Sequence, residues 1–195
     1  MGKFTRRAKN RYYRSILYVV SEGKNTETTY FCRLQSFAHS RNKHIAVIPP
    51  GPNTSPKGVL QRLEEYLKST SLSKDDELWC VIDQDQWPDT HIDMLYKWCA
   101  SAEEGIYRGV ALSKPKFEIW LLAHFEDLKQ SNTTSKAVVA ALGTYLHEYD
   151  KTLGDWKPTE AEVRKAIERA KQFTNGVYGQ RSGTTMWELA EHIFE

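Results

Sequence analysis

The sequence predicts an α/β fold in which a mostly parallel sheet of four strands is flanked by helices, with a helical extension toward the C-terminus. Short apolar runs typical of buried strands alternate with amphipathic helical stripes, and this alternation carries the prediction. The chain has 195 residues, which is enough for one well-buried domain of this class. The predicted strands are Ser15–Ser21, His44–Pro49, Glu77–Asp83 and Ile106–Leu112.

Three amphipathic helices are predicted between these strands, because apolar residues recur there at three- and four-residue spacing. The apolar stripes run from Tyr30 to Ala38, from Val59 to Leu67 and from Ile92 to Cys99. Strands and helices that alternate at these lengths favour right-handed crossover connections, and such connections make neighbouring strands parallel.

The pattern becomes entirely helical after residue 113. A dense apolar run over residues 117–125 predicts a helix packed on the sheet, and residues 137–149 predict a second helix. Thr159 and Glu162 have the spacing of a capping box and open a third helix after a loop. The same spacing precedes a last short helix that ends near Phe194.

Basic residues crowd the first fourteen positions, although the net charge of the whole chain is only +2. Such an arm fits contact with the phosphate backbone of a nucleic acid, and a solvated tail explains it equally well. We therefore divide the chain into a basic arm (1–14), an α/β domain (15–127) and a helical extension packed on the same domain (128–195). The basic residues of the arm expected to bind substrate are Arg6, Arg7 and Arg11.

The cysteines show no C-x-x-C spacing, and the basic N-terminus lacks the apolar core of a signal peptide. No run approaches the length of about eighteen apolar residues that a membrane helix needs. These features predict a reducing, cytoplasmic setting without membrane contact, in which Cys32, Cys80 and Cys99 are small core residues.

Acidic residues directly follow two of the predicted strands. Glu22 comes after the first strand, and Asp83 and Asp85 end the third. The carboxyl ends of parallel strands meet at one rim, so we expect these carboxylates to lie together. Gathered carboxylates repel one another unless a cation lies between them, and oxygen ligands suit Mg²⁺ or Mn²⁺. This predicts a metal-dependent enzyme acting on phosphodiesters, although turns and helix N-termini also explain each acid taken alone.

Further acids and lysines are predicted near this rim. Glu27 lies one helical turn beyond Glu22, where it is either a ligand for a second ion or an ordinary exposed first-turn acid. Glu118 interrupts an apolar run, and a buried carboxylate needs a partner or a metal. A lysine beside the acids would neutralise charge that develops on a phosphate. The candidates for that role are Lys24, Lys114 and Lys116, although a plain surface position explains any one of them.

Three motifs taken together resemble the RloB family. They are Val20–Glu27, the strand end Val81–Asp85, and Ser113–Phe125. That family is related to AbiLii and carries a Toprim-type fold, and the first two motifs are also similar to the Toprim nuclease part of the OLD family. The resemblance covers nearly the whole chain, including the basic arm.

The resemblance implies a Toprim-like sheet in which the strand ending in Asp83 lies beside the strand that leads to Glu22. It also implies that Glu22, Asp83 and Asp85 bind Mg²⁺ or Mn²⁺ and that the glutamate takes part in acid–base chemistry. Glu27 and Glu118 match further acids of the family patterns. The chain departs from the expected pattern at Lys114, where asparagine is expected and where a lysine would bind phosphate instead.

The implied function is that of a metal-dependent endonuclease that hydrolyses phosphodiester bonds in DNA or in RNA, tRNA included. Members of the family occur in restriction and abortive-infection loci, often with an AAA/ABC-type ATPase related to RloA. This setting suggests an antiphage effector that its partner gates. The alternative is a non-catalytic Toprim-like domain that binds an ATPase or a nucleotide and signals without cutting. A phosphotransfer receiver or phosphatase is a third interpretation, but such proteins usually have an aspartyl nucleophile where this chain has Glu22.

Overall fold

A computed structural model describes residues 15–84, 87–102, 105–129, 131–132, 134–147, 149, 151–174 and 182–194. Within these residues, five strands form one sheet in the order β2-β1-β3-β4-β5. The first four strands are parallel, and β5 pairs antiparallel with β4. The strands are β1 (Ser15–Ser21), β2 (Lys43–Val47), β3 (Glu77–Asp83), β4 (Tyr107–Lys114) and β5 (Gly183–Thr184).

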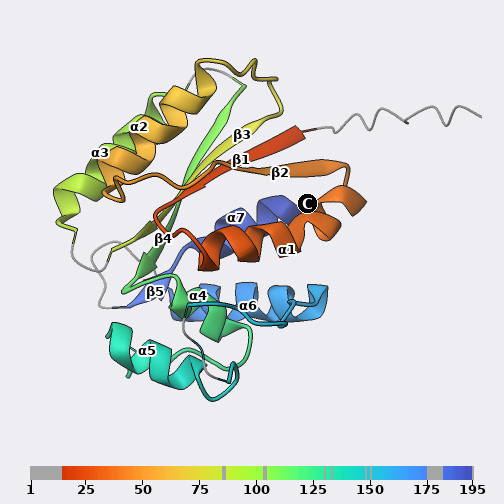
Figure 1. Cartoon of the computed structure of the whole chain (residues 1–195), viewed down its shortest axis with the longest axis vertical. Coiled ribbons are helices and arrows are strands. Elements are labelled where there is room, and N and C mark those ends of the chain that lie inside the picture. The colour runs from red at the N-terminus through yellow and green to blue at the C-terminus, as the bar shows by residue number, and fades with distance from the viewer. Residues whose placement is uncertain are drawn as a thin grey trace, which may run out of the picture.

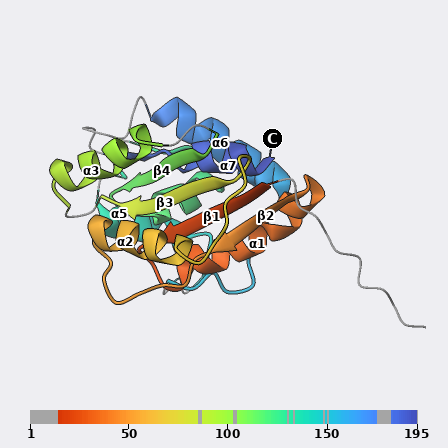
Figure 2. The same cartoon turned by 90° about the horizontal axis from the view of Figure 1, so that it is seen from above.

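Helices cover both faces of the sheet (Figures 1 and 2). On one face lie α2 and α3, and on the other lie α1 and α7, with α4, α5 and α6 beyond them. The helices are α1 (Thr26–Ser40), α2 (Pro56–Leu67), α3 (Asp89–Ala100), α4 (Glu118–Ala123), α5 (Ser135–Leu142), α6 (Glu160–Phe173) and α7 (Met186–Phe194). The predicted α/β class and the mostly parallel sheet are therefore confirmed.

Two apolar cores follow from the alternation of side chains along the strands. In β1, Leu17 and Val19 point into the core under α1 and α7, whereas Tyr18 and Val20 point into the core under α2 and α3. Because both faces of β1 are buried, its sequence is a nearly continuous apolar run. This is typical of strands in a parallel sheet that has helices on both faces. The side chains of α5 and α6 belong to the same core as those of α1 and α7.

Several predicted boundaries differ from the structure. The sheet has a fifth strand, because Gly183 and Thr184 pair with the end of β4. The strand predicted from residue 106 runs from 107 to 114 in the structure, and the one predicted over 44–49 runs from 43 to 47. The helix predicted over residues 137–149 ends at Leu142, and Gly143 follows as its C-cap. Only Cys80 of the three cysteines is a buried core residue, and Cys32 is exposed.

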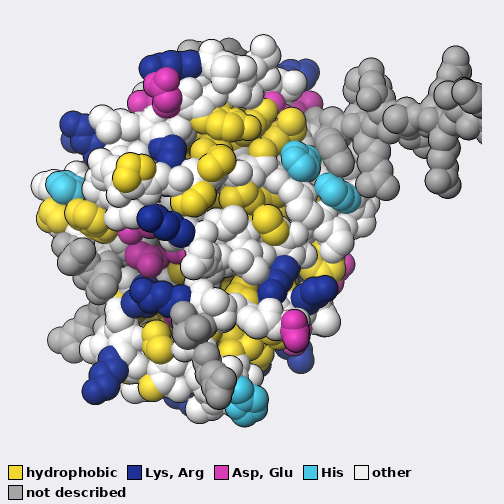
Figure 3. Space-filling view, in the orientation of Figure 1, with side chains coloured by type: hydrophobic (Ala, Val, Ile, Leu, Met, Phe, Trp, Pro, Cys, Tyr) yellow, Lys and Arg dark blue, Asp and Glu magenta, His cyan; other side chains and the backbone are white. Residues whose placement is uncertain are grey.

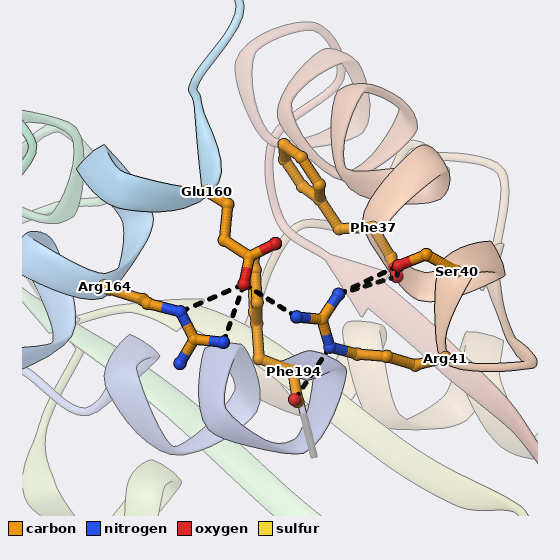
Figure 4. A network of polar contacts seen from close by, with 6 residues as sticks. All are labelled: Phe37, Ser40, Arg41, Glu160, Arg164 and Phe194. Atoms are coloured by element: carbon orange, nitrogen blue, oxygen red, sulfur yellow. Dashed lines mark hydrogen bonds and ion pairs between the residues drawn. The ribbon is translucent and has the colours of Figure 1, made fainter.

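A polar network joins three helices on the side of the sheet that holds α1 (Figure 4). Arg41, which follows α1, donates from Nη2 to Glu160 Oε1 at 2.7 Å and from Nε to the Phe194 carbonyl of α7 at 2.8 Å. Arg164, one turn along α6, binds the same Glu160 oxygen at 2.7 Å. In the part of the chain that is described, no helix is long and apolar enough to span a membrane.

Candidate functional site

A pocket of about 360 Å³ lies at the carboxyl ends of β1 and β3, and four carboxylates line it. They come from four separate places in the fold: the turn after β1, the first turn of α1, the end of β3 and the start of α4. Figure 3 shows an acidic patch left of centre on one face, with lysine or arginine side chains on both sides of it. The four residues are Glu22, Glu27, Asp83 and Glu118.

The sheet brings the first two predicted ligands together. Because β1 and β3 are neighbours, Glu22 and Asp83 lie at adjacent strand ends. The backbone N–H of Glu22 donates to the Val81 carbonyl at 3.3 Å, which continues the ladder past the end of β1. On the other side of β3, the Gln84 N–H donates to the Ser113 carbonyl at 2.8 Å. These backbone bonds hold both acids at the rim, as the sequence predicts.

Glu27 folds back over the turn that precedes α1. Its side chain is buried, and its carboxylate accepts the backbone N–H of Gly23. A Cβ atom on Gly23 would lie 1.8 Å from Glu27 Oε2, so glycine is the residue that permits this close approach. Burial and the nearby Glu118 carboxylate together raise the pKa of Glu27 to about 7. Glu27 is therefore a buried pocket residue and not an ordinary exposed helix acid.

The pKa of Asp83 is affected by all three other carboxylates of the pocket. Burial raises its pKa well above the ordinary value, and the carboxylates of Glu27, Glu22 and Glu118 raise that pKa further. Its ionised form is disfavoured unless positive charge enters the pocket. Of all the described aspartates and glutamates, only Asp83 has three other carboxylates among the causes of its raised pKa.

Glu118 begins α4 and is buried, as the interrupted apolar run predicts. Its Oε1 atom accepts a hydrogen bond from the Tyr149 hydroxyl at 3.1 Å. Burial, and next the Glu118 carboxylate, raise the pKa of Tyr149, which keeps the phenol protonated as a donor. The carboxylate thus has the partner that a buried acid needs, and one of its oxygens is held in a fixed direction.

The lysines divide between the pocket and its surroundings. Lys24 and Lys116 line the pocket, but Lys114 does not: it ends β4 and pairs with Gly183 of β5. Lys151 also lines the pocket, and its charge lowers the pKa of Glu27. The sequence analysis missed Lys151 and Tyr149, because neither residue lies in a motif or at the end of a predicted strand that would bring it to the rim. Four predicted site residues lie outside the described part of the chain: Arg6, Arg7, Arg11 and Asp85.

The donor set matches the chemistry of an oxygen-binding cation. Its four carboxylates supply oxygen ligands, the type that Mg²⁺ and Mn²⁺ prefer. Among the residues that the structure describes, no three His, Cys, Asp or Glu side chains are already arranged to hold a metal ion. Ligation by the described carboxylates would therefore require their side chains to turn toward one point.

The comparisons with known proteins place the chain in a family. No curated protein and no solved structure matches it significantly. The model of one protein family, described as "RloB-like protein", matches residues 17–193, a span that includes every described acid of the pocket. The span runs from β1 to α7 and covers more than half of the sequence, so the chain belongs to the RloB-like family.

Proposed function

We propose that the protein is a metal-dependent nuclease that hydrolyses phosphodiester bonds in nucleic acid, with the acidic pocket as its active site. The observation that carries this proposal is the convergence of four carboxylates on one pocket, where three of them raise the pKa of the fourth, Asp83. A protein that keeps such mutual repulsion in its fold is suited to a cation that removes it. The strand order β2-β1-β3-β4 is also the arrangement expected of a Toprim-like sheet.

In this proposal Glu22 and Asp83 hold Mg²⁺ or Mn²⁺ together with Asp85, and Glu27 and Glu118 are available for a second ion. A bound ion would polarise the scissile phosphate and lower the pKa of an attacking water. The residues of the chain then orient the substrate around that centre. Without a cation, those of the four carboxyl groups that stay ionised repel a phosphate anion, so the acids themselves make substrate binding favour the metal-bound protein.

The basic groups of the chain supply the remaining contacts with nucleic acid. Lys24 and Lys116 line the pocket, where an ammonium group would bind phosphate oxygens. The basic arm would add sequence-independent contact with the phosphate backbone, through Arg6, Arg7 and Arg11. Binding through such contacts weakens steeply as salt rises, because counterions are released when the complex forms.

Family membership supports a biological setting for this activity. The proposed role is that of an antiphage effector that acts in the cytoplasm and is held in check or activated by an AAA/ABC-type ATPase related to RloA. The substrate in that role is DNA or RNA, tRNA included. The alternative of a non-catalytic domain that binds the ATPase or a nucleotide predicts metal or partner binding without cleavage.

The test is a nuclease assay on the purified chain with DNA and with total tRNA, each with Mg²⁺, with Mn²⁺ and with EDTA. Asp83→Asn removes one ligand charge, and we expect it to abolish metal-dependent cleavage. Asp75→Asn is the matched control, because Asp75 is an exposed acid just before the opposite end of β3. Cleavage that persists in Asp83→Asn would contradict the proposed site. Metal binding without cleavage, even with the ATPase added, would favour the non-catalytic alternative.

A further inference from the structure

A loop from the C-terminal part of the chain brings one residue, Lys151, to the acidic pocket. We call residues 151–156 the strap. The strap is tied to α1 at both of its ends. Thr26 Oγ1 donates to the Lys151 carbonyl at 2.6 Å. Arg33, two helical turns further along α1, donates to the carbonyls of Leu153 at 3.3 Å and Gly154 at 2.6 Å, and also to that of Trp156.

These bonds fix the backbone from which Lys151 extends. Its backbone has φ of +73°, in the left-handed region that non-glycine residues rarely adopt. Such a conformation persists where the surrounding structure determines it, and here the Thr26 and Arg33 bonds do so. Lys151 lines the pocket, and its charge favours the ionised form of Glu27. The strap therefore holds a cation beside the acids.

The same segment also reaches a second acid of the pocket. Two residues before Lys151, the Tyr149 hydroxyl donates to Glu118. The Glu118 carboxylate raises the pKa of Glu27, so Lys151 and Tyr149 act on two acids of one cluster. Both groups come from a segment far from the β1 and β3 motifs in the sequence, and the fold places them at the carboxyl ends of those strands.

We propose that Lys151 is a catalytic residue that contacts a non-bridging oxygen of the scissile phosphate, and that Arg33 is a positioning residue that acts through the strap. This inference rests on the proposed nuclease function. In the hydrolysis, a bond forms between the water oxygen and phosphorus, and the bond from phosphorus to the leaving oxygen breaks with its electron pair. One water proton ends on that leaving oxygen. Lys151 stabilises the negative charge that develops on the phosphate oxygens meanwhile.

The test compares three substitutions at Lys151 in the full chain. Lys151→Met removes the charge, and Lys151→Asn removes it with a residue that tolerates the left-handed backbone. For both we expect kcat to fall by roughly 100-fold or more, as for other lost groups that stabilise transition-state charge, and KM to rise by about 10-fold, because the phosphate of the bound substrate also loses its contact. Lys151→Arg keeps the charge and is expected to restore part of kcat. The matched control is Lys157→Met, an exposed lysine beyond the strap and outside the pocket, which should behave as the wild type.

The positioning role of Arg33 has a separate readout. Arg33→Met keeps the lysine at position 151 but removes the side chain that donates to three strap carbonyls. We expect kcat to fall by roughly 10-fold, because misplacing a catalytic group is costly even when the group is present. In the Lys151→Met background the same substitution should add little, since the two residues act as one unit. Independent effects that multiply would contradict the positioning role.

The outcomes separate this inference from the proposed function. If the wild type cleaves with metal and both neutral Lys151 variants cleave equally well, the inference is overturned and the nuclease stands. If the wild type does not cleave, the deciding probe is a fluorescein-labelled oligonucleotide bound in Ca²⁺, followed by anisotropy. Binding that is weakened by about 10-fold in Lys151→Asn but not in Lys157→Met supports the phosphate contact. Equal binding by all variants, or no binding by the wild type, overturns it.

Discussion

Glu27 shows how one residue carries the electrostatics of the pocket. It is held by a backbone N–H over a glycine, buried against Glu118 and opposed by Lys151. The fold thus keeps a carboxyl group whose pKa of about 7 lies close to neutral pH. A group of this kind changes its charge with small changes of pH or on the arrival of a cation.

The raised pKa of Glu27 predicts how stability depends on pH. The folded state disfavours the ionised form of Glu27. Its contribution to the free energy of unfolding is therefore fully present below pH 4.5, the ordinary pKa, and is lost as pH rises through about 7. The loss amounts to about 3 kcal/mol for the metal-free protein. Asp83 shifts in the same direction. Thermal unfolding at intervals from pH 5 to pH 8 in EDTA should therefore show a falling Tm.

Glu27→Gln should flatten that fall, and added Mg²⁺ should reduce it in the wild type, because a cation favours the ionised carboxylates. The control is Glu64→Gln, which changes an exposed acid on α2 and should keep the slope of the wild type. Equal slopes for the wild type and Glu27→Gln would show that Glu27 titrates in the folded state as it does in the unfolded chain.

The acids of the pocket were predictable from the sequence, and the groups that face them were not. Glu22 and Asp83 directly follow apolar strands, and parallel pairing fixes where strand ends meet. Glu118 stands out because it interrupts an apolar run. Lys151 and Tyr149 carry no such signal, because their position depends on side-chain bonds from α1 to backbone carbonyls of a loop. Side-chain to backbone bonds across such distances leave no pattern in the local sequence.

At the scale of the elements, the start of α6 was predicted correctly from a local sequence motif, the capping box. Thr159 accepts the N–H of Glu162, and the Glu162 side chain accepts the N–H of Thr159, so the predicted capping box is present. The helix carries four buried residues into the core: Val163, Ala166, Ile167 and Ala170. Its start is therefore fixed by local bonds, and its face is fixed by packing.

Removing this cap should destabilise the protein measurably. Thr159→Ala leaves the N–H of Glu162 without its side-chain acceptor, at a cost of roughly 1 kcal/mol. For a chain of this size that cost corresponds to a drop in Tm of about 2–4 °C. Glu162→Gln is the matched control, because glutamine keeps the reciprocal bond to the Thr159 N–H. If both variants melt at the wild-type temperature, the capping box does not contribute to stability.

The strand β5 and the end of α5 differ from the sequence prediction for different reasons. The strand β5 has only two residues, and it forms because Gly183 and Thr184 meet the edge of β4 late in the chain. No two-residue segment has a periodicity, so tertiary contact alone decides that it is a strand. The early end of α5 coincides with Gly143, a residue of low helix propensity, although its backbone still has helical dihedral angles.

At the scale of the whole molecule, Arg41 joins parts of the chain that are far apart in sequence. It binds Glu160 of α6 and the carbonyl of Phe194 in α7, and its guanidinium lies 4.7 Å from the centre of the Phe194 ring. Arg164 shares the same Glu160 oxygen, but its side chain is more exposed and its partner is one turn away on the same helix. In Figure 4, the bonds from Arg41 to Glu160 and to the Phe194 carbonyl link separate helices, whereas the bonds from Arg164 to Glu160 stay within α6.

Arg41→Met should cost roughly 1–2 kcal/mol of unfolding free energy, because it removes hydrogen bonds to a charged group and leaves a helix-end carbonyl without its donor. Arg164→Met removes an exposed ion pair within α6 and a contact of the guanidinium with the Phe194 ring at 5.4 Å, and it should cost less, up to about 1 kcal/mol. Urea unfolding of both variants measures the difference. A larger loss in Arg164→Met than in Arg41→Met would contradict the view that Arg41 holds the helices together.

The position of the strap in the sequence determines when the pocket is completed during synthesis. During synthesis the ribosome releases β1, α1 and β3 first, at about 5–20 residues per second. A nascent chain of that length carries Glu22 and Asp83 but has neither Lys151 to line the pocket nor Tyr149 to hold Glu118. The pocket is therefore completed only after translation has passed the strap. If the protein is a nuclease that uses Lys151, a product truncated before the strap would lack the group that stabilises charge on the phosphate.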